Sequence, residues 1–165
     1  MLRYSTLDTP TGPFTVVVTK DGVVRAAGFT TDVPELMRLM SPKLRAPAEA
    51  NDDVGPVRDA VRAYLDGDLT ALDAVQVEQH TRGEFMSHAW DVMRQIKPGA
   101  PVTYTRYAAL AGRPLAVRGA ASACARNAVA LILPCHRVLR TDGSLGGYRW
   151  GLPVKSWLLA HEANG

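Results

Sequence analysis

The sequence predicts an α/β chain in two parts, a small sheet-containing domain over residues 1–80 and a mainly helical domain over residues 81–165. Three observations predict this arrangement. β-Branched residues around a turn open the chain, apolar residues recur at helical spacing in the middle, and a helix-turn-helix outline occupies the second half. With 165 residues, 47% of them apolar, the chain is long enough to bury a core.

The opening residues predict a β-hairpin. Residues 14–19 are mostly β-branched, Asp21-Gly22 is a turn pair, and residues 23–29 are again extended in character. The first third of the chain is therefore expected to be partly β-sheet.

Three helices are expected between this sheet and residue 100. Pro34 suits the first turn of a short helix that ends near Met40. A second helix begins at Pro56 and should pack one face on the sheet, because its apolar residues recur at helical spacing: Val57, Val61, Tyr64 and Leu65. Residues 70–84 are polar and form the link to the second domain. A third, amphipathic helix follows and stops at Lys97-Pro98-Gly99: its apolar residues are Phe85, Ala89, Trp90, Val92, Met93 and Ile96.

The second domain contains the helix-turn-helix outline. Thr103 can cap a helix over residues 104–111, residues 112–114 form a sharp Gly-Arg-Pro turn, and residues 115–127 form a second helix. Around Arg118 this helix carries small side chains: Ala116, Gly119, Ala120, Ala121, Ser122, Ala123 and Ala125. Small residues permit either tight packing on a protein core or entry into a DNA groove, and the pattern alone fits both.

Charge divides unevenly along the chain. Residues 1–100 hold 11 Lys/Arg and 14 Asp/Glu, net −3, whereas residues 101–165 hold 8 Lys/Arg and two acidic residues, net +6. Seven of these eight basic residues are arginines, whose planar forks match phosphate geometry. The second half therefore favours a polyanion partner, although a merely soluble basic surface would look the same.

The sequence suggests no targeting segment, membrane helix or metal site. The first residues lack an apolar stretch behind a basic start, and no later run approaches the roughly 18 apolar residues of a membrane helix. Cys124 and Cys135 are too few for a disulfide framework and have no Cys-x-x-Cys spacing. We expect a cytoplasmic protein with two free thiols, no metal and no cofactor.

A continuous apolar run leads into the residues most suited to chemistry. Residues 129–133 are expected to form a short buried strand or extended segment, which delivers the chain into Pro134-Cys135-His136-Arg137. A cysteine followed by two potentially cationic residues is well placed to be a thiolate nucleophile. A lone buried cysteine beside a histidine is, however, more often inert packing.

Several elements in the same order resemble the O6-alkylguanine-DNA alkyltransferase family. The resemblance covers roughly residues 83–162 and rests on the run Pro134-Cys135-His136-Arg137-Val138 together with its partners: Trp90, Val102-Thr103-Tyr104, Arg118, Asn127, Gly143 to Tyr148, Gly151, Lys155 and Leu158 to Glu162. More faintly, residues 4–29 are similar to the family's N-terminal sheet, including its turn at residues 9–13. The resemblance implies a ribonuclease-H-like first domain and a DNA-binding helix-turn-helix in the second.

The resemblance also implies the roles of the reacting residues. Cys135 would accept the alkyl group irreversibly, once per molecule, and His136 and Glu162 would act on it as a relay with a bridging water. An ordinary thiol is mostly protonated at neutral pH, so such a base is what the displacement requires. Asn127 would support the turn that bears the cysteine. The pocket would be lined by Pro134, Val138, Tyr148 and Trp150.

The implied substrate is O6-alkylguanine in double-stranded DNA, with O4-alkylthymine left open. The damaged nucleotide must leave the duplex to be reached. By resemblance Arg118 would fill the gap, and Tyr104 would push on the 3′ phosphate and donate a proton to guanine N3. The other implied DNA contacts are Thr103, Ala116, Ala120, Ala121 and Ser122. We expect a monomer, with clustering on DNA left open.

Four departures from the family pattern bear on substrate range. Ala128 follows Asn127 where proline is usual, and Ala121 and Ser122 replace small glycines of the recognition helix. Arg149-Trp150 stands where smaller residues are frequent, which predicts a narrower or differently selective pocket. The first domain has no cysteine, so the structural zinc of some relatives is not expected.

Two other classes of function compete with alkyl transfer. A non-catalytic module that recognises alkylated DNA would lack the acceptor cysteine, whereas Cys135 is present. A cysteine hydrolase would need His136 as a direct base, yet adjacent residues of an extended segment point opposite ways unless the chain turns there. Turnover separates the classes, since a hydrolase releases product repeatedly.

Overall fold

The computed structural model describes all residues, 1–165, which form two compact units. The first unit comprises Met1–His80 with Ala128–Ile132, and the second comprises Thr81–Asn127 with Leu133–Gly165. The α+β fold class agrees with the sequence prediction. The sequence predicted contiguous domains, whereas Ala128–Ile132 belongs with the first unit, because Ala27 N donates to Ala128 O at 2.9 Å and Ala130 N to Ala27 O at 3.0 Å.

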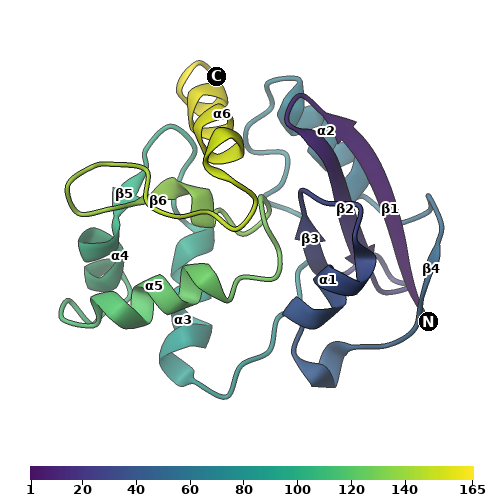
Figure 1. Ribbon diagram of the computed structural model, residues 1–165, viewed down its shortest axis with the longest axis horizontal. Coiled ribbons are helices and arrows are strands. Elements are labelled where there is room, and N and C mark those ends of the chain that lie inside the picture. The colour runs from purple at the N-terminus through teal and green to yellow at the C-terminus, as the bar shows by residue number, and fades with distance from the viewer. The chain divides into compact units, whose positions relative to one another are not determined.

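A four-stranded sheet forms the centre of the first unit (Figure 1). Its order is β3-β2-β1-β4; β1, β2 and β3 are antiparallel neighbours, and β4 runs parallel to β1. The predicted hairpin is β2 and β3, joined through Gly22, whose φ of 83° suits a glycine turn. The strands are β1 (Leu2–Thr9), β2 (Gly12–Val18), β3 (Val24–Gly28) and β4 (Ala48–Ala50).

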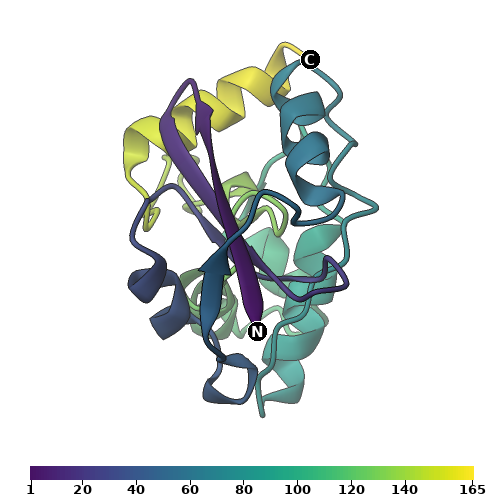
Figure 2. The ribbon, with the colours of Figure 1, turned by 90° about the vertical axis from the view of Figure 1, so that its right-hand side faces the viewer.

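The two helices predicted for the first unit are present. They are α1 (Val33–Leu39), with a proline in its first turn, and α2 (Val57–Leu65). A short 3₁₀ helix that was not predicted, η1 (Pro42–Leu44), lies in the segment expected to be a loop. Helix α2 buries Val57, Val61 and Tyr64, as its periodicity predicted. Figure 2 shows the sheet of this unit from its edge, with α1 and α2 beside it. The core of the sheet is apolar and fully buried at Phe14, Val16, Val17 and Val18.

The second unit is mainly helical. Its elements are α3 (Glu84–Arg94), β5 (Val102–Thr103), α4 (Tyr104–Leu110), α5 (Val117–Ala125), η2 (Cys135–Arg137), β6 (Val138–Leu139) and α6 (Leu152–Ala163). Strands β5 and β6 pair in parallel and bring the start of α4 beside the end of η2. None of the helices is long and apolar enough to cross a membrane.

Helix α3 supports the α4–α5 pair. The indole of Trp90 donates to Ala123 O at 2.9 Å, and the hydroxyl of Tyr107 donates to Ala89 O. Gly119 permits the close approach of α5, because a Cβ at this position would lie 2.9 Å from the Phe85 ring. These contacts fix the two helices that frame the site.

Candidate active site

The predicted helix pair is present, with a cap and a turn where the sequence placed them. The hydroxyl of Thr103 accepts a hydrogen bond from Arg106 N at 3.1 Å and caps α4. Gly112, with φ 88°, makes the turn that follows, and α5 begins at Val117. Thr103 thus has a structural role in the free protein.

Helix α5 has one buried face and one accessible face. Ala120 and Ala123 are fully buried, whereas Arg118 is exposed and Ala121 and Ser122 are partly exposed. The DNA contact predicted at Ala120 stays a prediction, while in the free protein its small side chain serves packing. Helical geometry explains this, since residues 120 and 123 share the face turned to the core.

The chain reaches the cysteine through a turn rather than a continuous strand. Val129 forms an isolated β-bridge with Ala27 rather than part of a strand, and Leu131 adopts φ 73°, a conformation that costs a non-glycine residue free energy. The prediction of an extended run over residues 129–133 was therefore wrong beyond its first residues. The side-chain amide of Asn127 donates to Leu133 O at 3.0 Å, so Asn127 stabilises the chain on both sides of this turn.

Cys135 opens the 3₁₀ helix η2, whose cap is Pro134. Because the chain turns there, the cysteine and the histidine that follows need not point in opposite directions, as they would along a strand. The Cys135 thiol is free and partly exposed. Burial raises its pKa, while a hydrogen bond from Asn127 and the positive charge of Lys155 oppose that effect.

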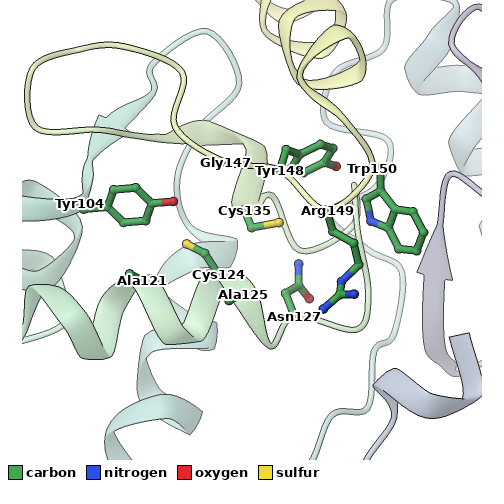
Figure 3. Close-up of a pocket in the computed structure, with 10 residues that line it drawn as sticks. All are labelled: Tyr104, Ala121, Cys124, Ala125, Asn127, Cys135, Gly147, Tyr148, Arg149 and Trp150. Atoms are coloured by element: carbon green, nitrogen blue, oxygen red, sulfur yellow. The ribbon is translucent and has the colours of Figure 1, made fainter. Parts of the chain in front are cut away.

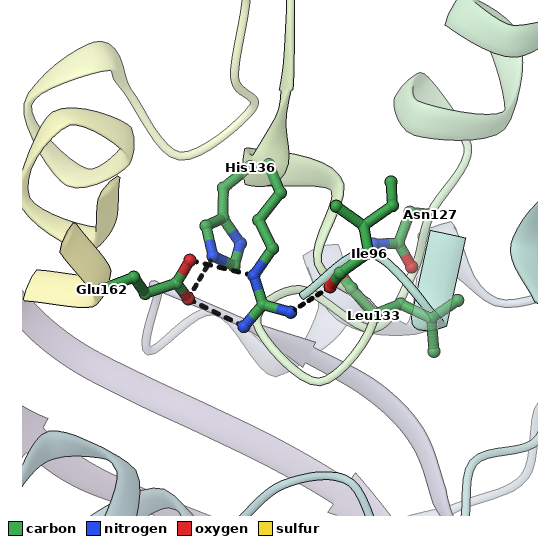
Figure 4. A network of polar contacts seen from close by, with 6 residues as sticks. Ile96, Asn127, Leu133, His136 and Glu162 are labelled. Carbon is green, nitrogen blue, oxygen red and sulfur yellow. Dashed lines mark hydrogen bonds and ion pairs between the residues drawn. The ribbon is translucent and has the colours of Figure 1, made fainter. Parts of the chain in front are cut away.

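A buried polar network lies behind the cysteine (Figure 4). His136 Nε2 lies 2.8 Å from Glu162 Oε2. Arg137 grips the same carboxylate with two hydrogen bonds, from Nε to Oε1 and from Nη2 to Oε2, both 2.9 Å, and Nη1 donates to Ile96 O at 2.6 Å. The side chains of His136 and Glu162 are 0% and 1% exposed, so the hydrogen bond between them is shielded from water.

The network determines which nitrogen of His136 carries the proton. Burial raises the pKa of Glu162, but hydrogen bonds from His136 and Arg137 outweigh it and lower that pKa to about 2, so the carboxylate is ionised. An ionised carboxylate only accepts hydrogen bonds, so His136 Nε2 must be the donor. Burial also lowers the pKa of His136, which keeps the ring neutral. Nδ1 is then an unprotonated acceptor, and it has no hydrogen-bond partner within the protein.

The Cys135 side chain opens into a cavity of about 400 Å³ (Figure 3). Of the residues predicted to line a pocket, Tyr148 and Trp150 do so, whereas Pro134 and Val138 are buried outside it. Burial raises the pKa of Tyr104 to about 12, so its hydroxyl keeps its proton at neutral pH. The cavity is lined by Tyr104, Ala121, Cys124, Ala125, Asn127, Cys135, Gly147, Tyr148, Arg149 and Trp150.

Lys155 joins the cysteine segment to the loop on the other side of the cavity. Its ammonium group is fully buried and donates to Val138 O at 2.8 Å and to Gly147 O at 3.3 Å. Burial lowers the pKa of this group. The lysine therefore fixes the wall that carries Tyr148 and places a positive charge near Cys135.

Three residues of the site went unassigned in the sequence analysis. The sequence placed Arg137 only as a charge beside the thiol, Lys155 only as part of the family pattern, and Cys124 only as a free thiol. Only Cys124 could have been placed from its spacing. Cys124 lies three residues after Ala121 and next to Ala125, four residues after Ala121, so the three share one helix face. No group of three or more His, Cys, Asp or Glu side chains is arranged to hold a metal ion.

The fold and this site match one family of proteins. The model of the 6-O-methylguanine DNA methyltransferase DNA-binding domain matches residues 84–164. A methylated-DNA–protein-cysteine methyltransferase of Methanosarcina barkeri is 32% identical over 167 residues, covering 99% of this chain and 98% of that protein. The chain belongs to the methylated-DNA–protein-cysteine methyltransferase family.

One further relative by sequence and one solved structure are also similar to this chain. The Escherichia coli bifunctional transcriptional activator/DNA repair enzyme Ada is 51% identical over 79 residues, which are 48% of this chain and 22% of Ada; the chain thus spans about a fifth of that protein. A crystal structure of Mycobacterium tuberculosis OGT in complex with DNA superposes with a TM-score of 0.80 at 27% identity, covering 98% of this chain and 93% of that one.

Proposed function

We propose that this protein repairs DNA by moving an alkyl group from O6 of guanine in a duplex onto Sγ of its own Cys135. The observation that carries the proposal is the juxtaposition of a cavity-lining thiol with a neutral, oriented histidine that is itself held by an ionised carboxylate. A thiol whose pKa is raised by burial needs such a base to become a nucleophile.

Activation of the thiol follows from the tautomer of His136. With Nε2 hydrogen-bonded to Glu162, Nδ1 is the basic nitrogen, and we assign it as the acceptor of the Cys135 proton through one water. The imidazolium that forms is stabilised by the carboxylate already in place. Arg137 keeps that carboxylate fixed and ionised before the reaction begins.

The displacement balances without a cofactor. Sγ of Cys135 forms a bond to the alkyl carbon. The bond from that carbon to O6 breaks, and the electron pair of the broken bond passes to guanine. Tyr104, which holds its proton at neutral pH, donates to guanine N3 so that the base leaves neutral. The proton that His136 takes from Cys135 equals in number the proton that Tyr104 gives to guanine, so the protein keeps its net charge. The thioether has no route back to the thiol, so each molecule reacts once.

Access to the alkylated base requires it to leave the duplex, at a cost of a few kcal/mol. Arg118 is exposed on α5, which suits the proposed role of filling the gap in the stack. The arginine-rich second half supplies attraction for phosphates. Arg149 and Trp150 line the cavity and are proposed to limit the size of the alkyl group.

We also propose that the protein acts as a monomer in the cytoplasm. Both cysteines are free, which suits a reducing compartment. Size-exclusion chromatography with and without duplex DNA would test the monomer and would reveal clustering on the duplex.

The test of the proposed function is intact-protein and peptide mass spectrometry after incubation with excess duplex that carries one O6-methylguanine. We expect one added methyl group on the Cys135 peptide and none in Cys135→Ser. A protein that binds the lesion but stays unmodified would instead be a recognition module. Repeated release of methanol without protein modification would identify a hydrolase.

A further inference from the structure

A second thiol opens into the cavity that holds Cys135. Cys124 lies on the accessible face of α5, with Ala121 and Ala125, and lines the cavity together with Cys135. Figure 3 shows Cys124 between Tyr104 and Cys135; its sulfur lies on the side of Tyr104, while the sulfur of Cys135 is directed away from Cys124, toward Arg149 and Trp150. Alkyl transfer to Cys135 makes no use of this thiol.

The two thiols influence each other electrostatically. Burial raises the pKa of Cys124 and of Cys135, and a negative charge on Cys135 raises the pKa of Cys124 further. The pair therefore releases one proton more easily than two. A single thiolate beside a protonated thiol is the arrangement that turns oxidation into a disulfide, because the second thiol can attack the oxidised sulfur.

We propose that Cys124 and Cys135 form a redox modification site in which a hydroperoxide converts the pair to an intramolecular disulfide. The thiolate of Cys135 attacks the peroxide and the O–O bond breaks. Cys135 becomes a sulfenic acid, and the other oxygen takes up the proton that the thiol gave up and leaves as an alcohol or water. Cys124 then attacks that sulfur, its proton leaves with the hydroxyl group as water, and the S–S bond forms. Both sulfurs are oxidised by one electron each, and the peroxide is reduced by two.

The structure favours this route over further oxidation of Cys135. Cys135 is the first residue of η2, and its side chain borders the same cavity as that of Cys124. Ten residues separate the two cysteines, and they include the turn at Leu131, so the bridge closes a short loop that already doubles back. A disulfide needs its two Cβ atoms about 3.5–4.5 Å apart, so both side chains rotate toward each other and η2 and α5 meet at that distance when the bridge forms.

The consequence for repair rests on the proposed function. The disulfide removes the alkyl acceptor, and a dithiol reductant restores it, whereas sulfinic and sulfonic acids at Cys135 are lost for good. Cys124 would thus preserve a protein that cannot regenerate its nucleophile after use.

The experiment uses the full chain and needs no DNA for its main readout. The reduced protein is titrated with hydrogen peroxide, free thiols are blocked with N-ethylmaleimide, and intact and peptide masses are measured. We expect a loss of about 2 Da, a peptide pair joining Cys124 to Cys135, and full reversal by dithiothreitol, the mass change following from the loss of two hydrogens. Cys124→Ser and Cys124→Ala should instead gain two or three oxygens at Cys135, which dithiothreitol does not remove.

Two results would overturn the proposal. One is oxygen gain at Cys135 in the wild type at the rate seen in Cys124→Ser. The other is a disulfide that joins two chains. Methyl acceptance after oxidation, expressed for each variant relative to its own reduced sample, gives the functional readout. Because the disulfide is detected by mass alone, its absence and a failure of alkyl transfer remain distinguishable.

Discussion

Arg137 holds the buried carboxylate of Glu162, and its replacement by methionine should destabilise the protein strongly. Methionine keeps an unbranched side chain of similar length but removes all three of the hydrogen bonds described above, two to Glu162 and one to Ile96 O. Glu162 would keep its hydrogen bond with His136 but lose this cation, while remaining 3% exposed. A buried carboxylate that loses its cation retains the cost of its desolvation.

The size of the effect can be worked out in two ways. A Glu162 pKa of about 2, against an ordinary value of 4.5, means that the site binds the carboxylate about 3 kcal/mol more strongly than the neutral acid. Removing one partner of a buried ion pair costs about 3–5 kcal/mol. We therefore expect Arg137→Met to lower the free energy of unfolding by about 3 kcal/mol. We also expect the pKa of Glu162 to rise, because burial is then no longer opposed by Arg137.

Urea unfolding followed by tryptophan fluorescence measures this change. The matched control is the double variant Arg137→Met with Glu162→Gln, which removes the stranded charge and should recover part of the lost stability. A loss below about 1 kcal/mol for the single variant, or a double variant no more stable than the single one, would refute the assignment of Arg137 as the counter-ion. Methyl transfer by folded Arg137→Met should slow by about tenfold or more, because the carboxylate no longer fixes the tautomer of His136.

Three other predictions concern DNA, pH and the backbone. Arg118→Ala should weaken repair of duplex DNA far more than reaction with free O6-benzylguanine, with Arg126→Ala as the exposed control; equal losses in both assays would contradict the base-flipping role. Because burial holds the pKa of His136 below 6.5, stability should fall as the pH drops below 6.5, by up to about 1.4 kcal/mol per pH unit. His136→Gln should flatten that slope in urea titrations, and an unchanged slope would count against a neutral His136. Gly99→Ala should cost about 1–2 kcal/mol, because φ is 78° and the new Cβ would lie 3.2 Å from Glu162 O; a neutral thermal melt would contradict this.

Local patterns were enough to predict most of the elements. The Asp21-Gly22 turn, the apolar spacing of α2 and the Thr103 cap each depend on neighbours close in sequence, and each is present. Strand β4 is three residues long and pairs with β1 across more than forty residues, so no local pattern announces it. The apolar run before Cys135 was predicted to be extended but contains a turn. Its composition could not separate the two, since burial produces the same apolar composition in a turn and in a strand.

The residues proposed to react could be named from the family pattern, but their energetic relations could not. Whether Arg137 faces the thiol or the carboxylate depends on where α6 places Glu162, 25 residues further along the chain. The buried ammonium of Lys155 has backbone carbonyls as its partners, and carbonyls leave no trace in a sequence. The shared cavity of Cys124 and Cys135 likewise arises only when α5 and η2 pack together.

The resting state of the nucleophile follows from this burial. Because burial raises the pKa of Cys135 and the opposing hydrogen bond and charges only moderate it, the thiol is protonated at neutral pH. A permanently ionised thiol would react with any electrophile that entered the cavity. With a neutral His136 as the proton acceptor, the thiolate forms by transfer of the thiol proton, and its population stays small between reactions. Under the proposed single-use function, a mostly protonated thiol loses fewer acceptors to electrophiles other than the alkylated base.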